Sequence, residues 1–111
     1  MSSDLNFVEF ITEQLQGSGI ITYKKMFGEF AIYCDAKVVG LICNNQFFVK
    51  PTESGRKYIG AVNEEAPYKG AKRYFLIEDM LEDRARLSEL IAITASELPL
   101  PKTKKPKVKK Q

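Results

Sequence analysis

The feature that most constrains this chain is a run from Met26 to Lys50 in which short apolar stretches alternate with two tight-turn signals. The stretches are rich in Phe, Ile, Val, Tyr and Leu, which favour β-strands. The interruptions are Asp35-Ala36-Lys37 and Asn44-Asn45. Asparagine tolerates a positive φ better than other non-glycine residues, and a two-residue type I′ turn requires positive φ at both central positions. The run therefore predicts three antiparallel strands joined by two hairpin turns.

A turn at Asn44-Asn45 also fixes which side chains face each other across the second hairpin. The expected pairs are Cys43 with Gln46, Ile42 with Phe47, and Leu41 with Phe48. Successive pairs lie on opposite faces of a hairpin, so both faces carry large apolar side chains. Because a sheet that is apolar on both sides must be covered on both, we expect helices on one face. The other face is expected to meet a protein partner or a second copy of the chain.

Periodicity and turn residues divide the rest of the chain into further elements. The expected elements are a helix over 3–16, a strand over 20–27, a helix over 53–61, a loop over 62–72, a strand over 73–77 and a helix over 78–98, which can restart at 83. Ser2 or Ser3 can cap the first helix and Thr52 the second. The prediction is an α+β domain with a small antiparallel sheet packed with helices, in the order α-β-β-β-β-α-β-α.

The size and charge of the chain predict one domain with a tail. With 111 residues, we expect one domain over 1–98 and an unfolded Lys- and Pro-rich tail over 99–111. Six tail lysines account for the net charge of +3, and the remaining body carries −3. The candidate nucleic-acid-binding residues are these lysines: Lys102, Lys104, Lys105, Lys107, Lys109 and Lys110. A polycation can bind phosphate without sequence preference; the alternative is a tail that only keeps the protein in solution.

Two segments mix basic and aromatic residues. Arg56-Lys57-Tyr58 lies on the predicted second helix, and Tyr68 to Tyr74 interleaves tyrosines with Lys69, Lys72 and Arg73. Such interleaving can stack bases and neutralise phosphate. It is also typical of a solvated helix face and of a surface turn that leads into a strand. We favour the structural interpretation for both segments.

The chain lacks the residue types that most enzymes and metal sites use. It has no histidine, which removes the usual general base near neutral pH and the commonest transition-metal ligand. If 36 and 37 form the first turn, Cys43 faces Phe30, about 13 Å along the strand from Cys34. That separation is too long for a disulfide, so both cysteines are expected to be buried and free. We therefore expect no enzymatic activity, no cofactor and no metal.

Nothing in the sequence indicates a membrane or a secretory route. No apolar run approaches the ~20 residues of a membrane span. The first residues lack the basic region and apolar run of a secretory signal peptide. The expected location is the cytoplasm, with no membrane partner.

A set of short motifs resembles a known family. The motifs, in order, are Met26-Phe27-Gly28, Tyr33-x-Asp35-x-Lys37, Leu41-Ile42, Phe48-Val49-Lys50, Ala66-Pro67-Tyr68 and Arg73-Tyr74-Phe75, followed by the last helix. Together they resemble the N-terminal domain of the TfoX/Sxy family over roughly residues 7 to 98. Two positions depart from the family pattern: Glu29, where a second glycine is usual, and Ala36, where the turn usually has glycine.

The resemblance implies a function as well as a fold. TfoX/Sxy proteins are described as bacterial regulators of competence for DNA uptake, so it implies a non-enzymatic regulatory or adaptor domain that acts through protein contacts. Full members carry a second, C-terminal domain that resembles nucleic-acid-associated modules, and this chain has the lysine tail in its place. The alternative function is nucleic-acid binding in which the tail supplies non-specific affinity for phosphate.

Overall fold

The computed structural model describes residues 3–26 and 29–99. Its elements are α1 (Leu5–Gln14), a short 3-10 helix η1 (Gln16–Ser18), β1 (Ile21–Met26), β2 (Glu29–Cys34), β3 (Lys37–Cys43), β4 (Gln46–Val49), α2 (Glu53–Ile59), β5 (Asn63–Glu65), β6 (Tyr74–Ile77) and α3 (Arg84–Glu97). The predicted α+β class and order of elements are confirmed. The additions are the short η1 and β5, a three-residue strand within the segment expected to be a loop.

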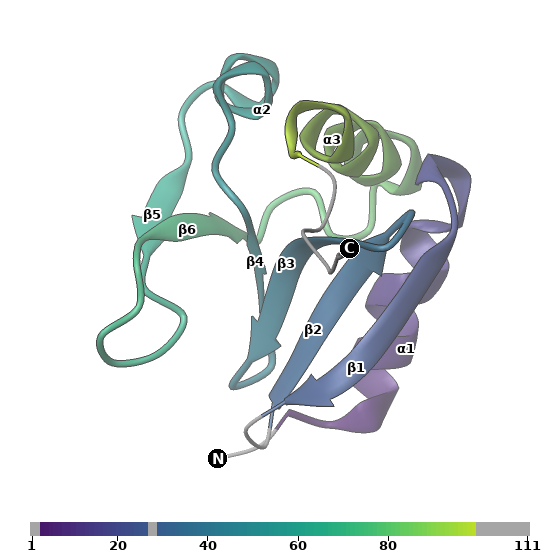
Figure 1. Ribbon diagram of the computed structural model, residues 1–111, viewed down its shortest axis with the longest axis vertical. Helices are drawn as coiled ribbons and strands as arrows, with labels where there is room; N and C mark the ends of the chain where they lie inside the picture. The colour runs from purple at the N-terminus through teal and green to yellow at the C-terminus, as the bar shows by residue number, and fades with distance from the viewer. Residues whose placement is uncertain (1–2, 27–28, 100–111) are drawn as a thin grey trace, which may run out of the picture.

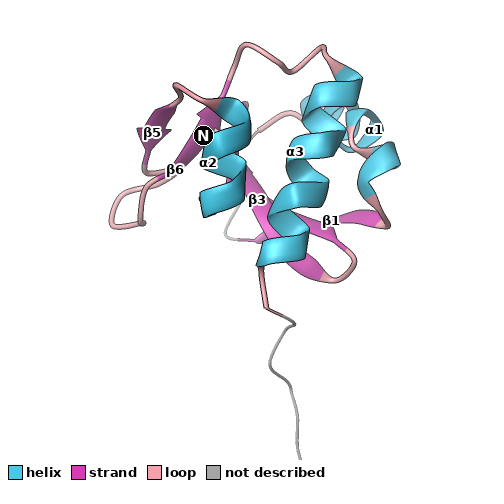
Figure 2. Ribbon diagram, turned by 90° about the horizontal axis from the view of Figure 1, so that it is seen from above, coloured by secondary structure: helices cyan, strands magenta, loops and turns pink. Residues whose placement is uncertain are grey.

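The strands form one six-stranded antiparallel sheet in the order β1-β2-β3-β4-β6-β5. Strand β1 lies at one edge of the sheet, because it pairs only with β2 among the described residues. Figure 1 shows α1 beside β1 and α2 above the β5–β6 end of the sheet. Helix α3 lies between them and contacts both other helices, and Figure 2 shows the resulting helical layer from above.

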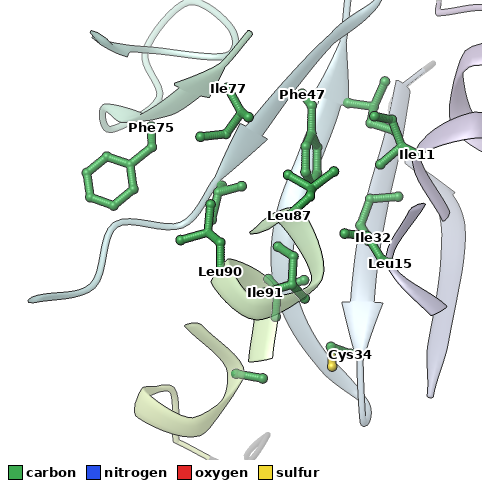
Figure 3. Packing of buried hydrophobic residues seen from close by; sticks show 14 of the residues in the cluster. Ile11, Leu15, Ile32, Cys34, Phe47, Phe75, Ile77, Leu87, Leu90 and Ile91 are labelled. Carbon is green, nitrogen blue, oxygen red and sulfur yellow. The ribbon is translucent and has the colours of Figure 1, made fainter. Parts of the chain in front are cut away.

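The main core lies between this helical layer and one face of the sheet (Figure 3). Helix α1 contributes Ile11 and its C-cap residue is Leu15, and the middle of α3 contributes three more fully buried side chains, Leu87, Leu90 and Ile91. Phe47 and Phe75 are the largest fully buried side chains that meet them from the strands. Each such side chain stabilises the fold by about 1.5–3 kcal/mol through removal from water. The 87/90/91 spacing is that of one helix face, which explains why α3 can be predicted from sequence.

The second hairpin forms with the predicted register. Asn44 and Asn45 have φ values of 56° and 58°, as a type I′ turn requires. The three cross-strand pairs are those expected: Cys43 with Gln46, Ile42 with Phe47, and Leu41 with Phe48.

The first hairpin has a different register from the predicted one. Its turn is Asp35-Ala36, so that Cys34 pairs with Lys37, and a β-bulge follows in which Val39 has no opposite residue. As a result Phe30 faces Ile42, whereas the sequence predicted that it would face Cys43. A bulge adds one residue to one strand and shifts every later pair by one. The expectation that both cysteines are buried and free is confirmed.

The helix boundaries are close to the predicted ones. Thr52 caps α2, because its Oγ1 accepts a hydrogen bond of 3.0 Å from the Gly55 backbone N–H. Asp83 caps α3 in the same way by accepting from the Arg86 N–H at 3.2 Å, so the restart at 83 is confirmed. The predicted serine cap of α1 is wrong. The N-cap residue is Asp4, whose side chain makes no capping hydrogen bond.

Candidate functional site

The face of the sheet opposite the helices is also apolar. Leu41, Phe48 and Leu76 form one cross-strand row over β3, β4 and β6. With Cys43 and Tyr74 they make a second hydrophobic cluster, separate from the main core. Phe48 and Leu76 are both buried although none of the described helices contributes a residue to this cluster. The prediction that the sheet is apolar on both faces is therefore confirmed, and we call this side the helix-free face.

An open groove lies beside this second cluster. Its volume is about 850 Å³, within the ~300–1,000 Å³ range of ligand pockets in proteins. Most of its exposed lining is apolar. The lining residues are Met26, Glu29, Phe30, Leu41, Cys43, Asn44, Pro67 and Tyr68. The connection between β5 and β6 supplies Pro67 and Tyr68, so the groove joins segments that are far apart in sequence.

Two exposed side chains stand at this groove. Met26 is 37% exposed and Tyr68 is 60% exposed, and both are large enough to bury considerable area against a partner. Tyrosine and methionine are enriched where proteins bind one another, because each offers apolar area without a charge that must lose its water. The groove therefore has the composition of a protein-contact surface.

The acidic residue in the groove is fully engaged in hydrogen bonds within the fold. Glu29 accepts from the Ser3 backbone N–H at 3.0 Å and from the Ser3 hydroxyl at 2.7 Å. Its second oxygen accepts from the Asn44 backbone N–H at 3.0 Å. Asn45 completes the network by donating its backbone N–H to the Ser3 hydroxyl and accepting from the Asp4 N–H through its side chain. Glu29 therefore ties the start of the chain to the second hairpin turn and is not placed to act as a general acid or base.

The cysteine in the groove lies in surroundings that favour the protonated thiol. Burial, reinforced by the nearby charge of Glu29, raises the pKa of the Cys43 thiol from its ordinary 9.0 to about 11. Burial is also the largest cause of the raised pKa of Cys34, with the neighbouring Asp35 second. A cysteine nucleophile needs a lowered pKa, whereas burial raises the pKa of both thiols.

Arg56, one of the two basic residues on α2 that the sequence singled out, has partners within the fold. Its guanidinium forms a 2.6 Å ion pair with Glu64 and lies 5.1 Å from the centre of the Phe75 ring. The hydrogen bond from Arg56 is the largest cause of the lowered pKa of Glu64. This pair connects α2 to β5, so the structural interpretation of Arg56 is favoured over phosphate binding.

The interleaved segment from 68 to 74 is divided between two environments. Tyr68 lines the groove and is exposed, whereas Tyr74 packs against the second cluster. Burial raises the pKa of the Tyr74 hydroxyl. The two rings therefore do not form one exposed stacking platform for bases.

The six tail lysines, Lys102, Lys104, Lys105, Lys107, Lys109 and Lys110, lie outside the described residues, so their binding role stays a prediction. Within residues 3–26 and 29–99, no group of three or more His, Cys, Asp or Glu side chains is placed to hold a metal ion. No helix in this part of the chain is long and apolar enough to cross a membrane.

The fold and its surfaces define a class: a small α+β domain with helices on one face of an antiparallel sheet and an apolar groove on the other. The family model of the TfoX N-terminal domain matches residues 13–98. A protein of Spirochaeta aurantia, described as an uncharacterized 12.7 kDa protein in the trpE 5′ region, is 38% identical over 109 residues. That match covers 98% of this chain and 95% of the relative. The chain belongs to the TfoX N-terminal domain family.

Proposed function

We propose that this chain is a non-enzymatic regulatory or adaptor domain of the cytoplasm that binds a protein partner in the groove of the helix-free face. The observation that carries this proposal is the apolar groove between Met26 and Tyr68. The groove lies on the side of the sheet without helices, where an apolar surface has no partner within the described residues. The Glu29 carboxylate in its lining already accepts three hydrogen bonds from within the fold, so we propose that recognition depends mainly on shape and apolar contact.

A photo-crosslinking experiment tests the position of the partner. p-Benzoylphenylalanine replaces Tyr68 in the groove or, as a matched control, Phe10 on α1, an exposed aromatic residue on the helical side. We expect a discrete cross-linked species in cells from position 68 and none from position 10. A second substitution in the groove, Leu41→Gln, should abolish that species. Equal cross-linking from both positions, or none from position 68, would contradict the proposal.

We further propose that this contact serves regulation of the kind implied by the TfoX resemblance, namely control of competence for DNA uptake. The test uses a naturally transformable host in which the gene is deleted. We expect the transformation frequency to fall and to be restored by the wild-type chain and by Phe10→Ala, but not by Tyr68→Asp. An unchanged frequency after deletion would remove the link to competence while leaving the cross-linking result to stand.

The alternative function is non-specific nucleic-acid binding, and the concentration of lysines in the tail supports it. We would measure fluorescence anisotropy on a duplex over a salt series with the full chain and with a variant in which the six tail lysines are changed to glutamine. If each lysine displaces one counterion, log K should fall with log salt at a slope of about −5. The variant should lose most of that slope. No binding by the wild-type chain near physiological salt would exclude this function.

A further inference from the structure

The outer edge of β1 is open. Strand β1 pairs with β2 on one side, and no described strand pairs with the other side (Figure 1). Five of its six residues are exposed, although it is one of the longer strands of the sheet. An exposed edge strand offers a row of unpaired N–H and C=O groups to another strand. Here the row is long enough for a regular ladder.

The hydrogen bonds to β2 identify which backbone groups point outward. The Asp35 backbone N–H donates to the Ile20 carbonyl at 2.9 Å, and Ile20 stands opposite Asp35 in the same register as the rest of the hairpin. In an antiparallel ladder, pairs that exchange hydrogen bonds alternate with pairs that do not. The backbone groups of residues 20, 22, 24 and 26 therefore point toward β2. Those of Ile21, Tyr23 and Lys25 point toward solvent.

This edge also concentrates exposed apolar area. Six large hydrophobic side chains are exposed in the described chain, and three of them lie along β1 and its first flanking residue. These are Ile20 at 72%, Tyr23 at 40% and Met26 at 37%. Apolar side chains on an unpaired strand are unusual unless another chain covers them, because they invite association. The edge therefore offers both hydrogen bonds and apolar contact.

We infer that β1 pairs antiparallel with β1 of a second copy of this chain, around a two-fold axis at Tyr23. In this register Tyr23 faces its own counterpart, and Met26 faces Ile20 of the second copy. Lys24 faces Thr22 of the second copy, and Lys25 faces Ile21 of the second copy. The whole strand is used, and about six backbone hydrogen bonds form between outward-facing residues.

The two lysines select this register among those that the ladder allows. An axis at Lys24 or Lys25 would place that lysine directly opposite itself, which is unfavourable for like charges. An axis at Thr22 would leave the end of the strand at Met26 without a partner. Like charge therefore disfavours the registers centred on the two lysines, and the register centred on Tyr23 is the one that pairs the whole strand.

The charges beside the edge are complementary across the same axis. Helix α1 carries the exposed acids Glu9 and Glu13 and no basic residue, whereas β1 carries two lysines and no acid. Lys25 stands opposite Phe30, a core residue on the helical side of the sheet, so it lies on the side where α1 packs beside β1. Pairing of the two strands brings Lys25 of one copy toward α1 of the other. Opposite potentials that meet in this way favour the docked orientation.

Disulfide cross-linking tests the register directly in the full-length chain. In the proposed pair the two copies of residue 23 are hydrogen-bonded neighbours with Cα atoms about 5.5 Å apart, within the range of a disulfide. We expect Tyr23→Cys to form a covalent dimer when oxidised glutathione accepts the electrons of the two thiols. Lys25→Cys is the matched control, because its two copies would lie about 13 Å apart along the strands. Lys25→Cys should cross-link at least ~10-fold more slowly than Tyr23→Cys. The native cysteines, Cys34 and Cys43, are buried and do not compete.

Proline substitutions test the same edge without cross-linking. Tyr23→Pro removes a backbone N–H that points outward, which an edge strand tolerates, whereas Lys24→Pro removes one that bonds to β2. By analytical ultracentrifugation we expect the wild type to dimerise and Tyr23→Pro to be a monomer with an unchanged circular-dichroism spectrum. Lys24→Pro should lose stability as well.

A wild-type monomer over the whole concentration range, or equal cross-linking at 23 and 25, would overturn the inference. A dimer lost in Leu41→Gln but kept in Tyr23→Pro would place the contact in the groove and also overturn it.

Discussion

The Glu29 carboxylate accepts two hydrogen bonds from Ser3, at 3.0 Å from its backbone N–H and 2.7 Å from its hydroxyl, across 26 residues of sequence. Because the same carboxylate also accepts from the Asn44 N–H, it holds the start of the chain against the second hairpin turn. Glu29 is one of the two positions at which the resemblance to the family led us to expect glycine. The departure has a structural consequence that glycine could not supply.

The first prediction follows from this network. Glu29→Gln keeps the size of the side chain but removes the charge and turns an amide toward backbone donors. Hydrogen bonds to a charged group contribute about 1.5–3 kcal/mol, so we expect a loss of about 2 kcal/mol in the free energy of unfolding, measured by urea denaturation. Glu82→Gln, at an exposed position in the turn before α3, is the control and should change stability little. Equal effects of the two substitutions would show that the network contributes nothing.

The second departure, Ala36, predicts a stabilising substitution. Ala36 has a φ of 71°, in the left-handed region that costs a residue with a Cβ roughly 1–2 kcal/mol. Ala36→Gly should therefore raise the free energy of unfolding by about 1 kcal/mol. Ala92→Gly, at an exposed position inside α3, should lower it by a similar amount, because glycine is a poor helix former. A loss of stability in Ala36→Gly would contradict the strain argument.

The third prediction concerns Gly40, which lies next to the bulge in β3. A Cβ added at Gly40 would lie 2.4 Å from the Phe48 carbonyl oxygen, a backbone atom that cannot move aside without disturbing β4. Gly40→Ala should therefore cost about 3 kcal/mol or more, as overpacking in a core does. The comparison is Gly60→Ala, where φ is 81° but nothing lies within 4 Å of the added atom. Its cost should be limited to backbone strain of about 1–3 kcal/mol, because φ 81° with ψ −126° is a conformation that residues with a Cβ rarely adopt. Thermal denaturation should show a larger loss of stability in Gly40→Ala than in Gly60→Ala.

Local signals in the sequence account for much of this fold. The Asn44-Asn45 turn, the Thr52 cap and the restart at Asp83 were all predictable, because each depends on a few neighbouring residues. The bulge at Val39 was not, because the strand carries only a weak signal for it. Gly40, one position later, is the only hint, and a glycine in a strand often accompanies a bulge. Strand β5 was missed because three polar residues, Asn-Glu-Glu, form it only by pairing with β6.

The candidate site was less predictable than the fold. The sequence indicated an apolar second face from the alternation of Leu41 and Phe48 with their neighbours. It did not place Pro67 and Tyr68 beside β2 and β3, because that contact depends on how the β5–β6 connection folds back. Ser3 was interpreted as a helix cap, whereas the structure uses it to bind Glu29. Long-range contacts of this kind leave no periodic signal in the chain.

The last prediction concerns alkaline pH and Cys43. Its thiol has a pKa of about 11 in the folded protein against an ordinary value of 9.0, because burial disfavours the thiolate. A raised pKa means that the stabilising contribution is fully present below pH 9 and is lost as the pH rises from about 9 to about 11. Cys43→Ala removes this titration at the cost of a small cavity. The difference in free energy of unfolding between wild type and Cys43→Ala, measured by urea denaturation, should therefore shrink by about 1–2 kcal/mol over that range. A constant difference would show that Cys43 ionises as readily in the folded chain as in the unfolded one.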